Sequence, residues 1–118
     1  MHWNSDQPIY QQVRDHVVSL IIDGVLTTGD PIPSVRQMAV EGGVNPLTVS
    51  KAYQELVDLK IVEKRRGLGM FIIESAKNQL IKLERDKFLK GDWPAAVRKA
   101  EQLDIDILDL VQKRKKSG

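Results

Sequence analysis

The stretch that decides the fold runs from Ser34 to Ile73 and reads SVRQMAVEGGVNPLTVSKAYQELVDLKIVEKRRGLGMFII. It opens with a short segment of helical spacing that ends at two consecutive glycines. A second segment of helical spacing follows at once, and two β-branched segments then flank a basic, glycine-containing turn. This order predicts two short helices joined by a tight turn, followed by a hairpin with a basic tip.

Capping residues mark the limits of these two helices. Ser34, with Gln37 three residues later, forms a capping box, and Gly42–Gly43 is expected to end the first helix. Asn45 is the expected N-cap of the second helix, with Pro46 in its first position. The stripe of the second helix that is expected to face the core consists of Val49, Ala52, Tyr53 and Leu56.

The flanking segments complete a mainly α fold with a small β-hairpin, whose strands are predicted at Ile61–Lys64 and Met70–Ile73. Pro8 is expected to open a first helix. After the hairpin, apolar spacing predicts a helix ending near Gly91, another starting at residues 92–94, and a last helix over 105–114. We therefore expect a winged helix-turn-helix over residues 1–74 and a helical tail over 75–118, with a frayed basic end from residue 113.

Composition excludes several classes of function. The chain has 118 residues, of which 42% are hydrophobic and 29% charged, so it can form a core. It contains no cysteine, and no apolar stretch approaches the ~20 residues that span a bilayer. No secretory signal is visible, so we expect a soluble, cytoplasmic protein. No catalytic arrangement, metal site or cofactor motif is found, and an enzyme is not expected.

The outer face of the second predicted helix is polar and suits the grooves of duplex DNA. Leu47 can contact a thymine methyl group, and Lys51 can reach a phosphate or a guanine. The same periodicity also fits an ordinary solvated helix. The neighbouring helix, turn and basic hairpin favour DNA binding. The outward residues are Leu47, Thr48, Ser50, Lys51 and Gln54.

These motifs resemble the GntR family of bacterial transcriptional regulators. The resemblance rests on residues 32–39, 44–56 and 66–71, and residues 8–13 look like the family's first helix. It implies that Arg36 contacts the DNA backbone and that Gly67 enters or skirts the minor groove. The positions that it implies face the groove are Asn45, Pro46, Leu47, Thr48 and Ser50.

Two departures from the family pattern lie at the expected interface. Many relatives have a polar residue at the position of Leu47, and an apolar side chain there shifts base recognition toward methyl contact. Many have Lys or Arg at the position of Leu68, which weakens the charge of the hairpin without removing Arg65 and Arg66. Gly67 and Gly69 serve the turn and are also expected to permit close approach to DNA.

The tail after Ile73 is similar to that of the short YtrA-type branch of the family, in which the tail serves dimerisation. Short amphipathic helices cannot bury their apolar faces alone, which independently predicts a partner surface for the tail. A homodimer would match a palindromic DNA operator, and we expect a homodimeric, sequence-specific regulator that acts as a repressor. A protein–protein adaptor and a weakly specific architectural DNA binder are the alternatives. A small-molecule effector is left open. The expected dimerisation residues are Leu80, Leu83, Phe88, Val97, Leu103, Leu108 and Val111.

Overall fold

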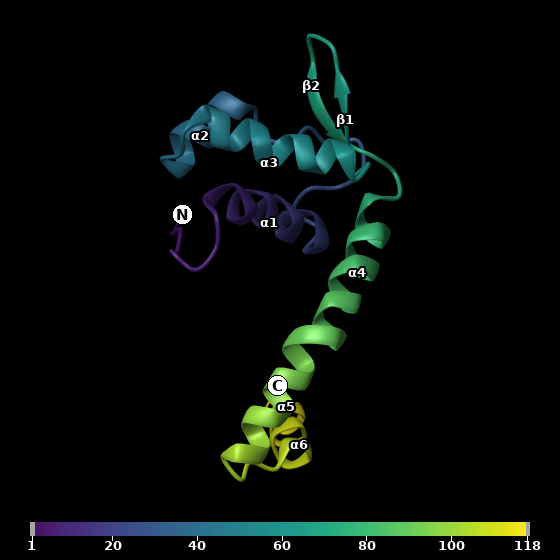
Figure 1. Ribbon diagram of the computed structural model, residues 1–118. Helices are drawn as coiled ribbons and strands as arrows, with labels where there is room; N and C mark the ends of the chain where they lie inside the picture. The colour runs from purple at the N-terminus through teal and green to yellow at the C-terminus, as the bar shows by residue number, and fades with distance from the viewer. Residues whose placement is uncertain (1, 118) are drawn as a thin grey trace. The chain divides into compact units, whose positions relative to one another are not determined.

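The computed structural model describes residues 2–117 (Figure 1). It divides into two compact units, the first ending at Ile81 and the second beginning at Lys82. It is mainly helical with one two-stranded antiparallel sheet, as predicted. None of the described helices is long and apolar enough to cross a membrane. The elements are α1 (Ile9–Ile22), α2 (Val35–Gly42), α3 (Pro46–Asp58), β1 (Val62–Arg65), β2 (Gly69–Ile72), α4 (Ala76–Lys87), the π-helical segment η1 (Phe88–Asp92), α5 (Trp93–Gln102) and α6 (Ile107–Ser117).

The core of the first unit lies where α1, α2 and α3 pack together. The predicted apolar stripe of α3 is confirmed, because all four of its side chains are buried. Val13, Val17 and Ile21 recur at helical spacing in α1 and meet that stripe. Burial on this scale stabilises a side chain by about 1.5–3 kcal/mol, so the stripe fixes which face of α3 points outward. The buried core residues of the three helices also include Val18, Met38 and Ala39.

The predicted caps set the turn between α2 and α3. The Ser34 hydroxyl accepts a hydrogen bond from the Gln37 backbone N–H at 3.0 Å, and the Gln37 side chain accepts one from the Ser34 N–H at 3.4 Å. Gly43 ends α2 in the left-handed region, at φ 61°. The Asn45 side chain accepts a bond from the Leu47 N–H at 2.8 Å, which starts α3. These contacts satisfy backbone groups that helix ends otherwise leave unpaired.

The N-terminal segment is held against α1 and the turn by contacts that the sequence does not reveal. The buried Gln12 side chain accepts a hydrogen bond from the Asn4 N–H at 2.9 Å and donates to the carbonyls of Asn4 and Gln7, both at 2.8 Å. The Trp3 indole N–H donates to the Gly42 carbonyl at 2.8 Å. This bond satisfies a carbonyl at the end of α2 and so supports the turn that presents α3.

The hairpin, which we call the wing (residues 62–72), has a third partner segment. In the register of the sheet, Val62 lies opposite Ile72 and Arg65 lies opposite Gly69. Residues 29–32 run along β2: the Ile32 N–H donates to the Met70 carbonyl at 2.9 Å, and Pro31 forms a bridge with Phe71. The loop before α2 therefore fixes the base of the wing, which the sequence analysis does not predict.

The start of α4 belongs to the first unit, contrary to expectation. Ala76 and Leu80 are 0% and 1% exposed and lie in the core of that unit. Leu80, which we expected on the dimerisation surface, is therefore unavailable there. The reason is that the sequence pattern shows an apolar face but not which surface covers it.

The helix start predicted at residues 92–94 is confirmed, because α5 begins at Trp93, but the preceding helix does not end near Gly91. Residues 88–92 form the π-helical segment η1, in which the Trp93 N–H donates to the Phe88 carbonyl, and α5 follows directly. Pro94 lies at the start of α5, where it lacks an N–H and its ring would crowd the preceding turn of an ordinary α-helix. The wider π-turn accommodates Pro94 without ending the helix.

The last helix extends further than predicted. It begins at Ile107, where the Asp106 side chain accepts a hydrogen bond from the Asp109 N–H at 3.2 Å, and it continues to Ser117. Residues 113–117, expected to be frayed, are therefore helical, whereas Gly118 lies outside the described residues. Lys113 pairs with Asp109 at 2.9 Å, and basic side chains near a helix C-terminus interact favourably with its dipole.

Candidate nucleic-acid interface

The outward face of α3 is formed by Leu47, Ser50 and Gln54, all exposed. Leu47 is 79% exposed, so its side chain is accessible to another molecule. Thr48, expected to face outward, is half-buried, while Asn45 and Pro46 are exposed at the start of the helix. The first half of α3 contains no acidic residue, since Glu55 and Asp58 both lie in its second half. Its N-terminal half is therefore the part that can approach phosphates.

The second half of α3 is less suited to DNA. The Gln54 amide donates a hydrogen bond to the Asp58 carboxylate at 2.9 Å, so its side chain is held toward a negative charge. A phosphate approaching this end would meet the Asp58 carboxylate. Gln54 is thus a weaker candidate for a phosphate contact than the sequence analysis assumes.

The flank of α3 that faces α1 carries Lys51 and Glu55. The Lys51 ammonium lies 3.9 Å from the centroid of the Tyr10 ring. One turn further along both helices, Arg14 donates to the Glu55 carboxylate at 2.7 Å and also pairs with Asp15 at 3.0 Å. Burial opposes the charge of Arg14, but the hydrogen bonds to Glu55 and Asp15 outweigh it and raise the pKa of Arg14. These two pairs fix the α1 flank of α3.

Arg36 lies in the first turn of α2 and is exposed, as a backbone-contacting residue requires. Among the described residues, none accepts a hydrogen bond from its guanidinium. A free guanidinium offers five donors, enough to bind a phosphate in a bidentate manner.

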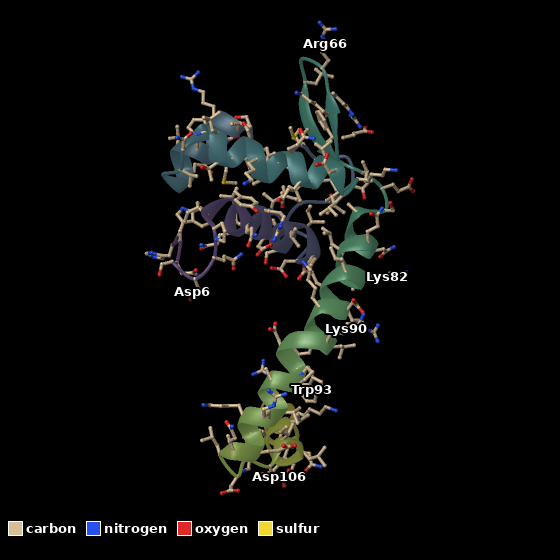
Figure 2. All side chains as sticks on the ribbon, in the orientation of Figure 1. Asp6, Arg66, Lys82, Lys90, Trp93 and Asp106 are labelled. Carbon is tan, nitrogen blue, oxygen red and sulfur yellow. The ribbon has the colours of Figure 1, made fainter. Side chains whose placement is uncertain are left out.

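The wing presents its two arginines differently. Arg65 is held on the strand face: it pairs with Glu63 at 2.8 Å, and its guanidinium lies 4.3 Å from the centroid of the Phe71 ring. Arg66 lies at the tip with its side chain directed away from the helices (Figure 2). Gly67 and Gly69 have φ angles of 77° and 117°, a region that favours glycine. Arg66 can therefore extend from the wing tip toward another molecule. Arg65 would first have to leave its ion pair with Glu63.

A groove of about 440 Å³ is lined by the loop before α2, the start of α2 and the wing. Ile32, Pro33, Leu68 and Met70 contribute to its lining. The Tyr53 hydroxyl donates to the Pro33 carbonyl at 2.7 Å and so ties this loop to α3. Burial, with a contribution from the Glu41 charge, raises the pKa of Tyr53 to about 12, so its hydroxyl stays protonated and can donate.

The first unit thus presents a polar helix face, an exposed arginine on α2 and a basic wing tip, all arising from one core. A profile of the family described as "Bacterial regulatory proteins, gntR family" matches residues 9–72 of the chain. The chain belongs to the GntR family. It is a transcriptional regulator with a DNA-binding helix-turn-helix, and the expectation that it is not an enzyme is confirmed because the family consists of regulatory proteins.

Similar proteins extend the likeness beyond the helix-turn-helix. YhcF of Bacillus subtilis (strain 168), an uncharacterized HTH-type transcriptional regulator, is 36% identical over 110 residues, which is 93% of this chain and 89% of YhcF. The HTH-type transcriptional repressor YtrA of the same strain is 44% identical over 77 residues, 65% of this chain and 59% of YtrA. A GntR family transcriptional regulator from Listeria monocytogenes has a similar structure, with a TM-score of 0.76, 30% identity and coverage of 97% of this chain and 98% of that one.

Several residues of this surface leave little or no local signal in the sequence. Tyr10 contacts Lys51 across two helices, a pairing that no local spacing reveals. Arg65 contacts Glu63 and Phe71. Glu63 lies two residues before Arg65 on β1 and Phe71 lies opposite Glu63 on β2, so the period-two spacing along the strands is the signal in the sequence for these contacts. The residues of the second unit that are expected to mediate dimerisation are exposed or half-buried: Leu83, Phe88, Val97, Leu103, Leu108 and Val111.

Proposed function

We propose that this regulator acts as a homodimeric repressor that binds a palindromic operator through α3, Arg36 and the wing. The observation that carries the dimer is the surface of the second unit. Among its described residues, Ala100 is the only one that is buried. A unit with so little core of its own needs a partner to cover its apolar surface.

The exposed apolar side chains of the second unit are numerous. Phe88 and Trp93 form an aromatic pair with ring centroids 6.3 Å apart, yet both rings remain more than 40% exposed. Aromatic side chains of this kind are enriched in the centres of protein interfaces. The large exposed apolar residues of this unit are Leu83, Phe88, Leu89, Trp93, Leu103, Ile105, Leu108, Leu110 and Val111.

A homodimer formed through the second unit would have two-fold symmetry, the commonest arrangement of soluble homo-oligomers. Its two copies of α3 would then be related by the same two-fold axis, so the matching DNA would be an inverted repeat. The assignment as a repressor is supported by the name of YtrA, and the cytoplasm is the proposed site of action because it holds bacterial DNA. The sequence leaves a small-molecule effector open.

Two adjacent substitutions test the dimer. Leu103 is 57% exposed, so Leu103→Glu should leave each chain folded while placing a charge in the proposed apolar interface. The control is Gln102→Glu, which adds the same charge at a neighbouring exposed residue at the end of α5. Sedimentation at micromolar concentration should show dimers for the unmodified protein and the control, and monomers for Leu103→Glu. A monomeric unmodified protein would refute the homodimer.

A further inference from the structure

We propose that the Tyr10 ring positions the Lys51 ammonium at the α1 flank of α3, so that Lys51 binds a DNA phosphate rather than a base. Tyr10, in α1, is then a positioning residue of the DNA interface. This inference rests on the proposed role of α3 as the helix that enters the major groove. It assigns one of the two ligands, phosphate or guanine, that the sequence leaves open for Lys51.

The contact between the two side chains fixes where the ammonium lies. The Lys51 nitrogen is 3.9 Å from the centroid of the Tyr10 ring, well inside the range of a cation–π interaction. The ring is itself restrained, because Tyr10 packs against the edge of the core and its hydroxyl accepts a hydrogen bond from the Gln11 amide at 3.3 Å. Lys51 is thus held toward α1 before any DNA is bound.

The neighbouring pair shows that this whole flank of α3 is tied to α1. Glu55 follows Lys51 by one turn, Arg14 follows Tyr10 by one turn, and Arg14 bonds Glu55 at 2.7 Å. Two successive cross-helix contacts therefore hold the same side of α3. Leu47 and Ser50 are on the exposed, outward face and have no such link to α1 among the contacts of the described residues.

The dimensions of DNA assign a ligand to each side of the helix. An α-helix with its side chains is about 10–12 Å across, and the major groove is about 12 Å wide. Side chains on the outward face therefore meet base edges, whereas side chains on a flank meet the phosphates along the groove walls. An ammonium has three donors, so Lys51 can keep the ring on one side and donate to a phosphate on another.

The experiment compares the full-length chain with Tyr10→Leu, Lys51→Met and the double variant, on an operator selected from random DNA and on an unrelated duplex. Lys51→Met should weaken binding to both duplexes by similar factors and flatten the dependence of log affinity on log salt by about 0.9, one phosphate's share. Tyr10→Leu should weaken both by about two- to five-fold. In the Lys51→Met background, Tyr10→Leu should have no further effect.

A matched variant separates the ring from the hydroxyl. Tyr10→Phe keeps the ring and should bind like the unmodified protein. The free protein gives an independent readout, because a ring beneath the ammonium shifts the NMR signals of the Lys51 side-chain protons upfield; this shift should persist in Tyr10→Phe and vanish in Tyr10→Leu. Thermal melts of all variants control for folding.

Any of the following results would overturn the inference: a changed base preference in Lys51→Met with unrelated DNA still bound normally, a Tyr10→Leu loss that persists in the double variant, or a Tyr10→Phe loss equal to that of Tyr10→Leu. If the unmodified protein binds no DNA, the proposed function fails instead. The NMR comparison then still decides whether the ring holds the ammonium. Normal DNA binding by all the variants would reject this inference alone.

Discussion

At the scale of single residues, the proposed DNA interface consists of side chains in different states of restraint. Arg36 is exposed and free of described partners, Lys51 rests on an aromatic ring, and Arg65 is paired with Glu63. A restrained side chain loses less conformational entropy on binding, whereas a paired one must first exchange its partner. These differences determine how each substitution should change DNA affinity.

Arg36 should act as a contact that does not depend on DNA sequence. Arg36→Ala removes one phosphate contact, so binding to the operator and to unrelated DNA should weaken by similar factors. The slope of log affinity against log salt should become shallower by about 0.9. Titrations at several salt concentrations measure both effects. Unchanged affinity and slope would remove Arg36 from the interface.

Tyr53 should make stability depend on alkaline pH. Its pKa is raised from 10.0 to about 12 in the folded state, so folding favours the protonated phenol. The stabilisation is complete below pH 10 and is lost as pH rises toward 12, because the unfolded chain releases this proton first. The loss amounts to roughly 3 kcal/mol.

The control for this prediction is Tyr53→Phe, which loses the hydrogen bond to the Pro33 carbonyl and should cost about 1 kcal/mol at neutral pH. Denaturant unfolding at a series of pH values measures the difference in free energy of unfolding between the two proteins. That difference should shrink and then reverse above pH 10. A difference that stays constant up to pH 12 would contradict the assignment.

At the scale of elements, local signals predicted α2, α3 and the wing, because each is bounded by residues with a strong conformational preference. Ser34, Asn45 and Gly43 fix the helix ends, and the buried stripe of α3 follows from its spacing. Pairing between distant segments left no such local signal. The strand-like contact of Pro31 with Phe71 and the π-turn before Pro94 therefore became visible only in the structure.

The wing offers a test that compares two glycines. Gly67 has φ +77°, and a Cβ added there would meet no atom within 4 Å. Gly67→Ala should therefore destabilise the protein by about 1–2 kcal/mol, and through backbone strain alone. Gly91 also has open space around it but lies within η1 without a positive φ. Gly91→Ala should therefore be neutral or stabilising. Thermal unfolding of both variants tests this, and the same sign of change in both would contradict it.

At the scale of the whole molecule, the sequence predicted an apolar tail but not where its apolar residues would be covered. Leu80 belongs to the core of the first unit, while Leu103 and Leu108 are exposed. Both kinds of residue look alike in a periodic pattern, since the pattern records polarity and not the covering surface. The elements α2, α3 and the wing were predicted better, because capped helices and a basic turn are local features.

Two truncations test how the units divide. A chain ending at Ile81 keeps Ala76 and Leu80, so its first unit should remain folded. It should be a monomer and bind the operator much more weakly, because a single winged domain lacks the effective concentration that a linked second domain provides. A chain ending at Ile73 loses both buried side chains and should be markedly less stable. Circular dichroism melts and sedimentation separate the two outcomes. Equal stability of both chains would remove Leu80 from the core.

In the proposed homodimer, two copies of α3 related by a two-fold axis bind one operator. The most direct measurement is selection of sequences bound by the full-length chain from a pool of random duplex DNA. A homodimer should enrich an inverted repeat of two half-sites separated by a fixed spacing of about one helical turn, centre to centre, or a multiple of it. Enrichment of a single isolated site, or of no sequence at all, would contradict it.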